Sequence, residues 1–292
     1  MSHPLFLSMS VKKVHHLDSF ILDEQLAMEE PLEIQVAFGE GSQRHLTNIG
    51  VTMRTPGHDT ELAVGYLISE GLLRNPSDLL QVCAMKSRVG HQAEILLSTT
   101  IEADVDHALR RYALQNHLGA NLKSSMQVLD LQQFRPVPSS PWQMDCDLVC
   151  DLPRRLQQAQ EMMDCPTGVH AAGLFRVDGT ERVIRQDVGR HNAIDKVVGH
   201  CFLNGTWPLH DSVMVVSGRA SFDLVQRAIA ASIPVLVAVG APSSLAVEVA
   251  QQYGVTLIGL TKSDGCNIYA GEDRLSMPIG KPRIDLFEEA LV

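Results

Sequence analysis

Residues 212–262 alternate between short apolar runs and stretches with helical periodicity, and this order limits the possible fold more than any other feature of the chain. The apolar runs at 212–216, 235–239 and 255–260 are rich in β-branched residues, as strands buried on both faces are. Apolar residues at helical spacing fill the segments 221–231 and 244–253 between them. Because strands joined by helices of this length run parallel, with right-handed crossovers, the sequence predicts an α/β fold.

The turns that follow two of these strands carry residues suited to an anionic ligand. The segments 217–219 (SGR) and 241–244 (APSS) each lie between a strand and a helix, at the carboxyl edge where open α/β sheets bind ligands. Free backbone N–H groups and the helix dipole favour an anion there, and the Arg219 guanidinium suits bidentate phosphate binding. These turns predict a phosphate or pyrophosphate site; the alternative is that glycine and serine only form tight connections.

A third polar junction lies between the predicted strand 182–186 and the predicted helix 193–202. It brings Asp187, Arg190, His191 and Asn192 to the start of that helix. One interpretation is a hydrogen-bonded strut that fixes the turn. The other is that Arg190 and His191 face an anionic or heterocyclic ligand while Asp187 orients one of them.

Two further basic residues have two interpretations each. His170 falls in the predicted strand 168–175 and is either a core histidine with satisfied hydrogen bonds or a ligand contact. Lys262 stands among the turn residues 261–269, after the strand that ends at the same sheet edge. It is either a solvated surface charge or a ligand contact.

Composition excludes several classes of protein. A formal net charge of −10 argues against a nucleic-acid surface, because the phosphate backbone demands a basic face. No apolar run reaches the roughly 18 residues of a membrane helix, and the first ten residues lack the features of a signal peptide. We therefore expect a soluble cytoplasmic protein that binds neither nucleic acid nor membrane.

The periodicities divide the chain into four parts. We expect a loosely packed extension at 1–28, a smaller α+β domain at 29–120, a central loop or linker at 121–141, and the α/β domain at 142–292. The smaller domain has predicted strands at 31–38, 45–53, 80–85 and 94–97, a turn at 39–41, and helices at 59–71 and 104–118. Asp59 or Thr60 is expected to cap the first helix, and residues 147–163 form an amphipathic helix that opens the α/β domain.

Six cysteines, at positions 83, 146, 150, 165, 201 and 266, do not form a disulfide framework in a chain of this size. Cys146 and Cys150 are four residues apart and could be a metal pair on a helix, but no second pair has metal-ligand spacing. We therefore expect no metal site. Cys201 is expected in the core, and Cys266 in a loop near the ligand edge.

Taken together, these stretches resemble the FdhD family, the accessory sulfurtransferases needed to make active formate dehydrogenase. The resemblance covers most of the chain, with several motifs in the right order. The matching motifs are 63–71 (AVGYLISEG), 167–172 (TGVHAA), 187–193 (DVGRHNA), 217–222 (SGRASF), 241–246 (APSSLA) and 256–259 (TLIG).

The resemblance implies a cytidine-deaminase-like three-layer domain with a smaller amino-terminal α+β domain, in a homodimer. It also implies transfer of sulfur from a cysteine desulfurase to a molybdenum or tungsten bis-guanine-dinucleotide cofactor, bound through its guanine nucleotide ends, so that GDP should bind. The zinc signature of the deaminases is missing, so no zinc is expected. Motif and position together predict these cofactor contacts: His170, Asp187, Arg190, His191, Asn192, Ser217, Gly218, Arg219, Ser243, Ser244, Leu260, Thr261, Lys262, Ser263, Asp264 and Gly265.

One departure from the family pattern bears on the reaction. The sulfur-carrying Cys-x-x-Cys of the family follows a Ser-Ser pair, and here Ser124-Ser125 is followed by Met126 and Leu129 at the two cysteine positions. Neither a thioether nor an aliphatic chain can form a persulfide. No catalytic residue is therefore assigned from this loop.

Three hypotheses remain open. The chain binds the cofactor and assists formate dehydrogenase maturation, or it also carries sulfur on another thiol such as Cys266 or Cys83. The third possibility is a non-catalytic or regulatory paralogue that keeps the fold.

Overall fold

The computed structural model describes residues 5–16, 18–38, 45–86, 91–97, 134–163 and 168–277. Its larger sheet has six strands in the order β13-β12-β11-β10-β8-β9. The strands are β8 (His170–Arg176), β9 (Glu181–Asp187), β10 (Ser212–Val216), β11 (Val235–Ala238), β12 (Thr256–Lys262) and β13 (Gly265–Ala270). The parallel arrangement predicted for β10, β11 and β12 is confirmed, while β8, β9 and β13 run antiparallel to their neighbours.

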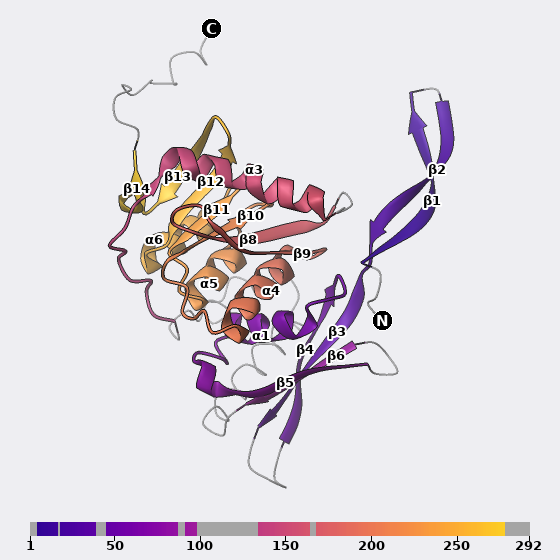
Figure 1. Ribbon diagram of the computed structural model, residues 1–292, viewed down its shortest axis with the longest axis horizontal. Helices are drawn as coiled ribbons and strands as arrows, with labels where there is room; N and C mark the ends of the chain where they lie inside the picture. Colours follow the sequence, from indigo (N-terminus) through magenta and orange to yellow (C-terminus); the bar gives the residue numbers. More distant parts are fainter. Residues whose placement is uncertain are drawn as a thin grey trace.

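Helices cover both faces of this sheet (Figure 1). Residues of β10 alternate: Val213 and Val215 pack in the cluster beneath α3, and Met214 and Val216 in the cluster on the opposite face. This period of two, apolar on both sides, is what a fully buried strand requires. The helices are α3 (Cys146–Met162) on one face, and α4 (Arg190–Leu203), α5 (Phe222–Ala230) and α6 (Ser244–Tyr253) on the other.

A smaller, four-stranded sheet has the order β4-β3-β6-β5. Its strands are β3 (Glu30–Phe38), β4 (His45–Arg54), β5 (Leu79–Lys86) and β6 (His91–Leu97), and α1 (Asp59–Ser69) follows β4. In Figure 1, α1 lies between this sheet and α4. One hydrophobic cluster contains side chains of the small sheet, of α1 and of α4 to α6.

Close packing of α1 on α4 depends on two glycines. A β-carbon on Gly65 would stand 1.8 Å from the carbonyl oxygen of Asp195, and one on Gly199 would stand 1.8 Å from that of Glu61. Any other residue at either position would force the helices apart. The α1–α4 contact therefore fixes how the small sheet sits against the larger one.

The start of the chain differs from the expectation of a loosely packed extension. Residues 6–27 form a regular antiparallel hairpin of β1 (Phe6–His15) and β2 (Asp18–Ala27), which projects from the body in Figure 1. Its side chains are largely exposed. With no buried face there is no apolar alternation to read in the sequence, and backbone pairing alone defines these strands.

Three smaller expectations were also wrong. α1 begins after His58, which makes no side-chain cap, and Asp59 instead pairs with Arg54 at 2.9 Å. α4 begins at Arg190, three residues before the predicted start. The segment 261–269, predicted as turn residues, instead contains the end of β12 and most of β13, which returns antiparallel to β12. Short elements complete the described chain: β7 (Met144–Asp145) pairs with β14 (Leu275–Ser276), and 3-10 turns span Pro76–Asp78 and Glu272–Arg274.

The domain boundaries at 28, 120 and 141 and the cytidine-deaminase-like layering of the α/β domain stay predictions. The predicted turn at 39–41, the predicted helix at 104–118, Met126 and Leu129 lie outside the described residues. Within the described ranges, no helix combines the length and apolarity needed to cross a membrane.

Candidate functional site

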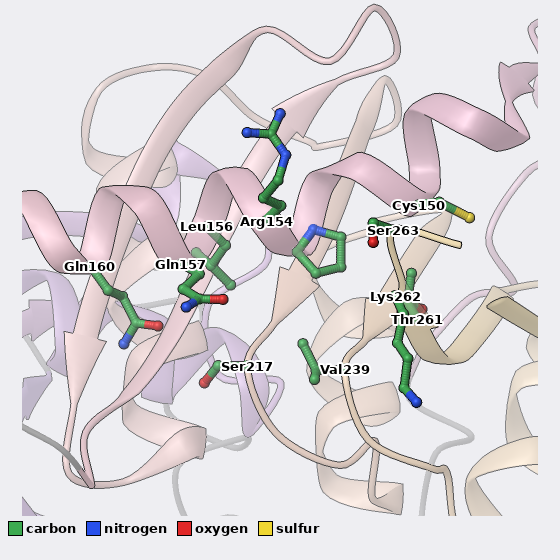
Figure 2. A pocket seen from close by; sticks show the side chains of 11 residues that line it. Cys150, Arg154, Leu156, Gln157, Gln160, Ser217, Val239, Thr261, Lys262 and Ser263 are labelled. Atoms are coloured by element: carbon green, nitrogen blue, oxygen red, sulfur yellow. The ribbon is translucent and has the colours of Figure 1, made fainter. Parts of the chain in front are cut away.

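A pocket of about 440 Å³ lies between α3 and the carboxyl ends of the parallel strands (Figure 2). The strand ends contribute Ser217 after β10, Val239 after β11, and Thr261, Lys262 and Ser263 at the end of β12. α3 contributes the opposite wall: Cys150, Pro153, Arg154, Leu156, Gln157 and Gln160. The pocket is therefore at the sheet edge predicted from the sequence.

The three strand-end turns are hydrogen-bonded to one another. The Gly240 N–H donates to the Gly218 carbonyl at 3.0 Å, and the Leu260 N–H donates to the Gly240 carbonyl at 3.2 Å. The Ser243 N–H donates to the Ala220 carbonyl at 3.0 Å. A β-carbon on Gly240 would stand 2.7 Å from the Arg219 Cγ. The structure thus brings Gly218, Arg219 and Ser243 to one edge, as the motifs predicted.

β12 bulges where it reaches the pocket. Its register with β13 shifts between Gly259 and Lys262, and Leu260 has a φ of 52°, an unusual conformation for a residue with a side chain. Such bulges re-aim the side chains that follow them. Here Leu260 is 43% exposed while the next side chain, Thr261, is buried against the pocket.

β8 and β9 bring histidine and carboxylate side chains to the same edge. Because β8 is antiparallel to β10, its first residue, His170, lies beside the end of β10 and pairs in register with Asp187. Ser217 Oγ accepts a hydrogen bond from the Ala171 N–H at 2.9 Å. His170 Nδ1 lies 3.4 Å from where a β-carbon on Gly218 would stand. Burial, together with the nearby Arg190 guanidinium and His191 imidazole, lowers the pKa of His170, which favours the neutral imidazole at pH 7.

Asp187 and Asn192 form the strut. Asp187 is fully buried and accepts hydrogen bonds from the backbone N–H groups of Thr55 and Gly189, at 3.2 and 2.8 Å, and from the Asn192 amide. Asn192 also donates to the Met53 carbonyl at 2.7 Å. These partners occupy both side chains within the protein. Asp187 and Asn192 therefore position the junction, which is the first of the two interpretations left open above.

Lys196 completes this buried network. Its Nζ lies 2.7 Å from Asp187 and donates to the Thr55 carbonyl at 2.9 Å. Burial lowers the pKa of Lys196, and the Asp187 carboxylate opposes that shift. The network ties α4 to the turn between β4 and α1.

Arg190 and His191, in the first turn of α4, are different. Arg190 Nε and His191 Nε2 are buried without a hydrogen-bond partner among the described residues, and so are Ser221 Oγ and Thr261 Oγ1. His191 Nε2 lies 3.6 Å from the Asp223 carboxylate, too far for a hydrogen bond. A buried polar atom without a partner is costly unless a ligand or water satisfies it. These atoms are therefore candidates for ligand contact.

Five other predicted contacts, Arg219, Ser243, Ser244, Asp264 and Gly265, are not among the residues that line the pocket. Ser243 caps α6 by accepting a hydrogen bond from the Ala246 N–H at 3.3 Å, as the sequence predicted. Ser244, Arg219 and Asp264 are exposed, and Gly265 pairs with Lys262 at the β12–β13 turn. Cys266 is on β13 rather than in the predicted loop.

Sequence reasoning missed the α3 wall. The amphipathic helix was predicted at 147–163, and the structure gives Cys146–Met162. Periodicity identifies its apolar face, Val149, Leu152 and Leu156, but only packing on the sheet shows that Gln157 and Gln160 reach the pocket. Within the described part of the chain, no set of three or more histidine, cysteine or acidic side chains is arranged to hold a metal ion.

Comparison with known proteins identifies the family. The model of the FdhD/NarQ family matches residues 27–276. The chain belongs to the FdhD/NarQ family. It is 39% identical over 254 residues to the sulfur carrier protein FdhD of Nocardia farcinica, covering 86% of this chain and 88% of that protein. The FdhD of Sulfurisphaera tokodaii is 32% identical over 265 residues, covering 91% and 97% of the two chains.

A solved structure supports the fold. A crystal structure from Desulfotalea psychrophila, of a protein provisionally described as a formate dehydrogenase accessory protein, superposes with a TM-score of 0.70 at 20% identity. The match covers 94% of this chain and 100% of the other. At this identity the likeness concerns the fold alone, and it shows that the mixed α/β architecture is shared with another FdhD-like chain.

Proposed function

We propose that this chain binds the guanine nucleotide part of a molybdenum bis-guanine-dinucleotide cofactor and acts as an accessory protein in formate dehydrogenase maturation. It would assist sulfuration of that cofactor, with sulfur supplied by a cysteine desulfurase. Homodimer formation and a cytoplasmic location belong to the same proposal. Its support from relatives is that FdhD members are named sulfur carriers and that a structural neighbour is described as a formate dehydrogenase accessory protein.

The observation that carries the proposal is the set of unpartnered donors around one sheet edge. Among the described residues, Arg190 Nε and His191 Nε2 are buried without a hydrogen-bond partner, and Thr261 Oγ1 is a third such atom, in the pocket itself. A nucleoside diphosphate has phosphate oxygens that can accept hydrogen bonds from all of these groups, and its base has further polar atoms. The net charge of the chain is −10, so a local cluster of cations at this edge indicates an anionic ligand rather than a generally basic surface.

Each part of the edge has a role in this proposal. The starts of α5 and α6 present free N–H groups to phosphate oxygens, with Arg219 beside them. The neutral His170 can offer one nitrogen as donor and the other as acceptor, which suits a heterocyclic base. Lys262, at the end of β12, and Arg154, on the α3 wall where it pairs with Asp151, add positive charge. Gln157 and Gln160 provide amides on the α3 wall.

Calorimetric titration with GDP tests the proposal. Wild-type protein should bind, and Arg190→Ala should bind about tenfold more weakly or worse, because a charge-assisted contact is lost. Arg176→Ala is a matched control, since Arg176 is exposed at the opposite end of β8 from His170. Absence of binding to folded wild-type protein at roughly millimolar GDP would refute the proposal.

A second candidate is a paralogue that binds the cofactor without carrying sulfur, or that only regulates maturation. It is favoured by Met126 and Leu129 at the family's cysteine positions. For a purely regulatory chain, the double variant Arg190→Ala/Arg219→Ala should restore formate dehydrogenase activity in a deletion strain as well as the wild type does. Failure of that variant to complement, with its fold intact, would exclude the purely regulatory role.

A further inference from the structure

Three cysteines from two distant parts of the chain meet beside the pocket. Cys146 and Cys150 are one turn apart on α3, and Cys266, on β13, lies near enough to both to interact with them electrostatically. Cys146 Sγ also lies 4.0 Å from Met277 Sδ. All three thiols are half-buried. We name Cys146, Cys150 and Cys266 the thiol cluster.

Within the thiol cluster, only Cys150 lines the pocket, where Lys262 and Ser263 are its neighbours in the lining. Figure 2 shows Cys150 at the edge of the pocket, on the same side as these two residues. Cys146 and Cys266 pack instead against the hydrophobic cluster between α3 and the sheet. A thiol that reacts with a substrate in the pocket must reach it, and Cys150 is the member of the cluster that borders the pocket, with its sulfur turned away from the other lining side chains in Figure 2.

The other described cysteines do not. Cys83 is on β5 of the smaller sheet, and no residue of that sheet lines the pocket. Cys201 is 3% exposed in the core beneath α4, and burial raises its pKa to about 11. Neither position combines access with a neighbouring thiol.

We propose that Cys150 is the sulfur-carrying thiol of this chain, accepting a sulfane sulfur from a persulfide donor and holding it at the pocket. This inference rests on the proposed function, which supplies the acceptor of that sulfur. It places the reactive sulfur on α3 rather than at positions 126 and 129, which correspond by resemblance to the family's cysteines.

The transfer is balanced without an added oxidant or reductant. The Cys150 thiolate attacks the terminal sulfur of a donor persulfide, R–S–SH, and a new S–S bond forms at Cys150. The S–S bond of the donor breaks, and the departing R–S⁻ takes up the proton that Cys150 released. The products are Cys150–S–SH and R–SH, so the sulfane sulfur changes partner and no net oxidation takes place.

Cys266 is a positioning residue in this scheme. Burial and the two neighbouring thiols raise the pKa of Cys266 to about 12, so it keeps its proton and can donate to the Cys150 sulfur. Burial also raises the pKa of Cys150, aided by the carboxylates of Asp147 and Asp264 and opposed by Cys266. Because this pKa lies above the ordinary thiol value of 9.0, sulfur loading should quicken as the pH rises and should still be rising at pH 9.0.

The test uses the full chain and cysteine persulfide as donor. After removal of the donor and alkylation, peptide mass analysis should find one added sulfur, on Cys150. Cys150→Ser should carry about tenfold less bound sulfur or none, because serine offers no thiolate, while the control Cys83→Ser should load as the wild type does. Circular dichroism checks that each variant is folded. Because Cys150 is only half-buried, its replacement by serine should leave the fold intact.

Cys266→Ser provides the second measurement. Its sulfur should still map to Cys150, but the pH profile of loading should differ from wild type because the S–H donor has changed. Sulfur on another cysteine, a Cys150–Cys266 disulfide without added sulfur, or unchanged loading of Cys150→Ser would overturn the inference.

GDP titration of the same samples separates this inference from the proposed function. Wild-type protein that binds GDP but takes up no sulfur refutes the role of Cys150 alone. Protein that loads sulfur on Cys150 but does not bind GDP refutes the nucleotide site alone.

Discussion

The junction between β9 and α4 has two sides that differ in how their polar groups are satisfied. On the inner side, Asp187, Asn192 and Lys196 are buried and bonded to one another and to the turn after β4. On the outer side, Arg190 Nε and His191 Nε2 are buried with no hydrogen-bond partner in the part of the chain that the structure describes. Polar and charged residues within ten positions of one another thus have different roles. The satisfied groups fix the backbone, and the unsatisfied ones are those that the proposed function assigns to a ligand.

The largest effect is expected on the inner side. Lys196→Met would leave the Asp187 carboxylate buried without its cation and should lower the free energy of unfolding by about 3–5 kcal/mol. Urea unfolding followed by circular dichroism measures this change. Lys262→Met, at an exposed position, is the control and should change stability little. Equal stability of the two variants would mean that the inner network is not structural.

Glu61 extends the inner side from α1 to β9 and α4. It accepts two hydrogen bonds from Arg185, one of them 2.9 Å long, and lies 2.9 Å from His200 Nδ1. Burial alone would raise the pKa of Glu61, but the hydrogen bonds from Arg185, His58 and His200 outweigh it, and the pKa falls well below its ordinary value of 4.5.

Glu61→Gln should lower the free energy of unfolding by about 2 kcal/mol at pH 7, because hydrogen bonds to a charged group are lost. The depressed pKa of the folded state means that this stabilisation is complete above pH 4.5 and disappears as the pH falls further. Thermal melts of both proteins across this range measure the difference. A difference that stays constant in acid would contradict the assignment.

On the outer side, Arg190→Ala should change ligand affinity and not stability. We expect GDP binding to weaken by about tenfold, equivalent to about 1.4 kcal/mol, with the free energy of unfolding within about 0.5 kcal/mol of wild type. Titration and urea unfolding of the same preparation provide both values. A large loss of stability with unchanged affinity would place Arg190 on the structural side.

The smallest effect is expected at the N-cap of α6, where Ser243 caps the helix and is also a predicted ligand contact. Ser243→Ala removes the hydrogen bond to the Ala246 N–H and should cost about 1 kcal/mol of stability. Ser244→Ala is the control, because Ser244 makes no cap. If Ser243 also contacts a phosphate, Ser243→Ala should weaken GDP binding as well as stability. GDP titration of Ser244→Ala then shows whether the neighbouring hydroxyl shares that contact.

The sequence predicted most of the elements but not all of their partners. The strand at 212–216 and the helix at 244–253 were predicted at the positions where the structure has them. Buried strands and capped helices carry strong local signals. β1 and β2 were missed because neither strand has a continuous buried face. β13 was missed because its residues follow a turn-rich segment, and its pairing with β12 is interrupted by the bulge at Leu260.

The same division applies to the site. Motifs placed Ser217, Arg219, Ser243 and Lys262 at one edge, since the carboxyl ends of parallel strands must meet. They could not show that Asp187 faces inward while Arg190 has an unpartnered nitrogen. That distinction depends on Thr55 and Met53, more than 130 positions away in the chain.

By itself, the sequence determined the α/β order, the sheet edge at which the pocket lies and the absence of cysteine at positions 126 and 129. Tertiary structure decided which polar residues are internally satisfied, how α3 closes the pocket, and that Cys266 meets Cys146 and Cys150. The physical reason is the distance along the chain over which each kind of signal acts. Periodicity and capping act within one element, whereas hydrogen-bond partners and thiol neighbours come from segments that only the packed core brings together.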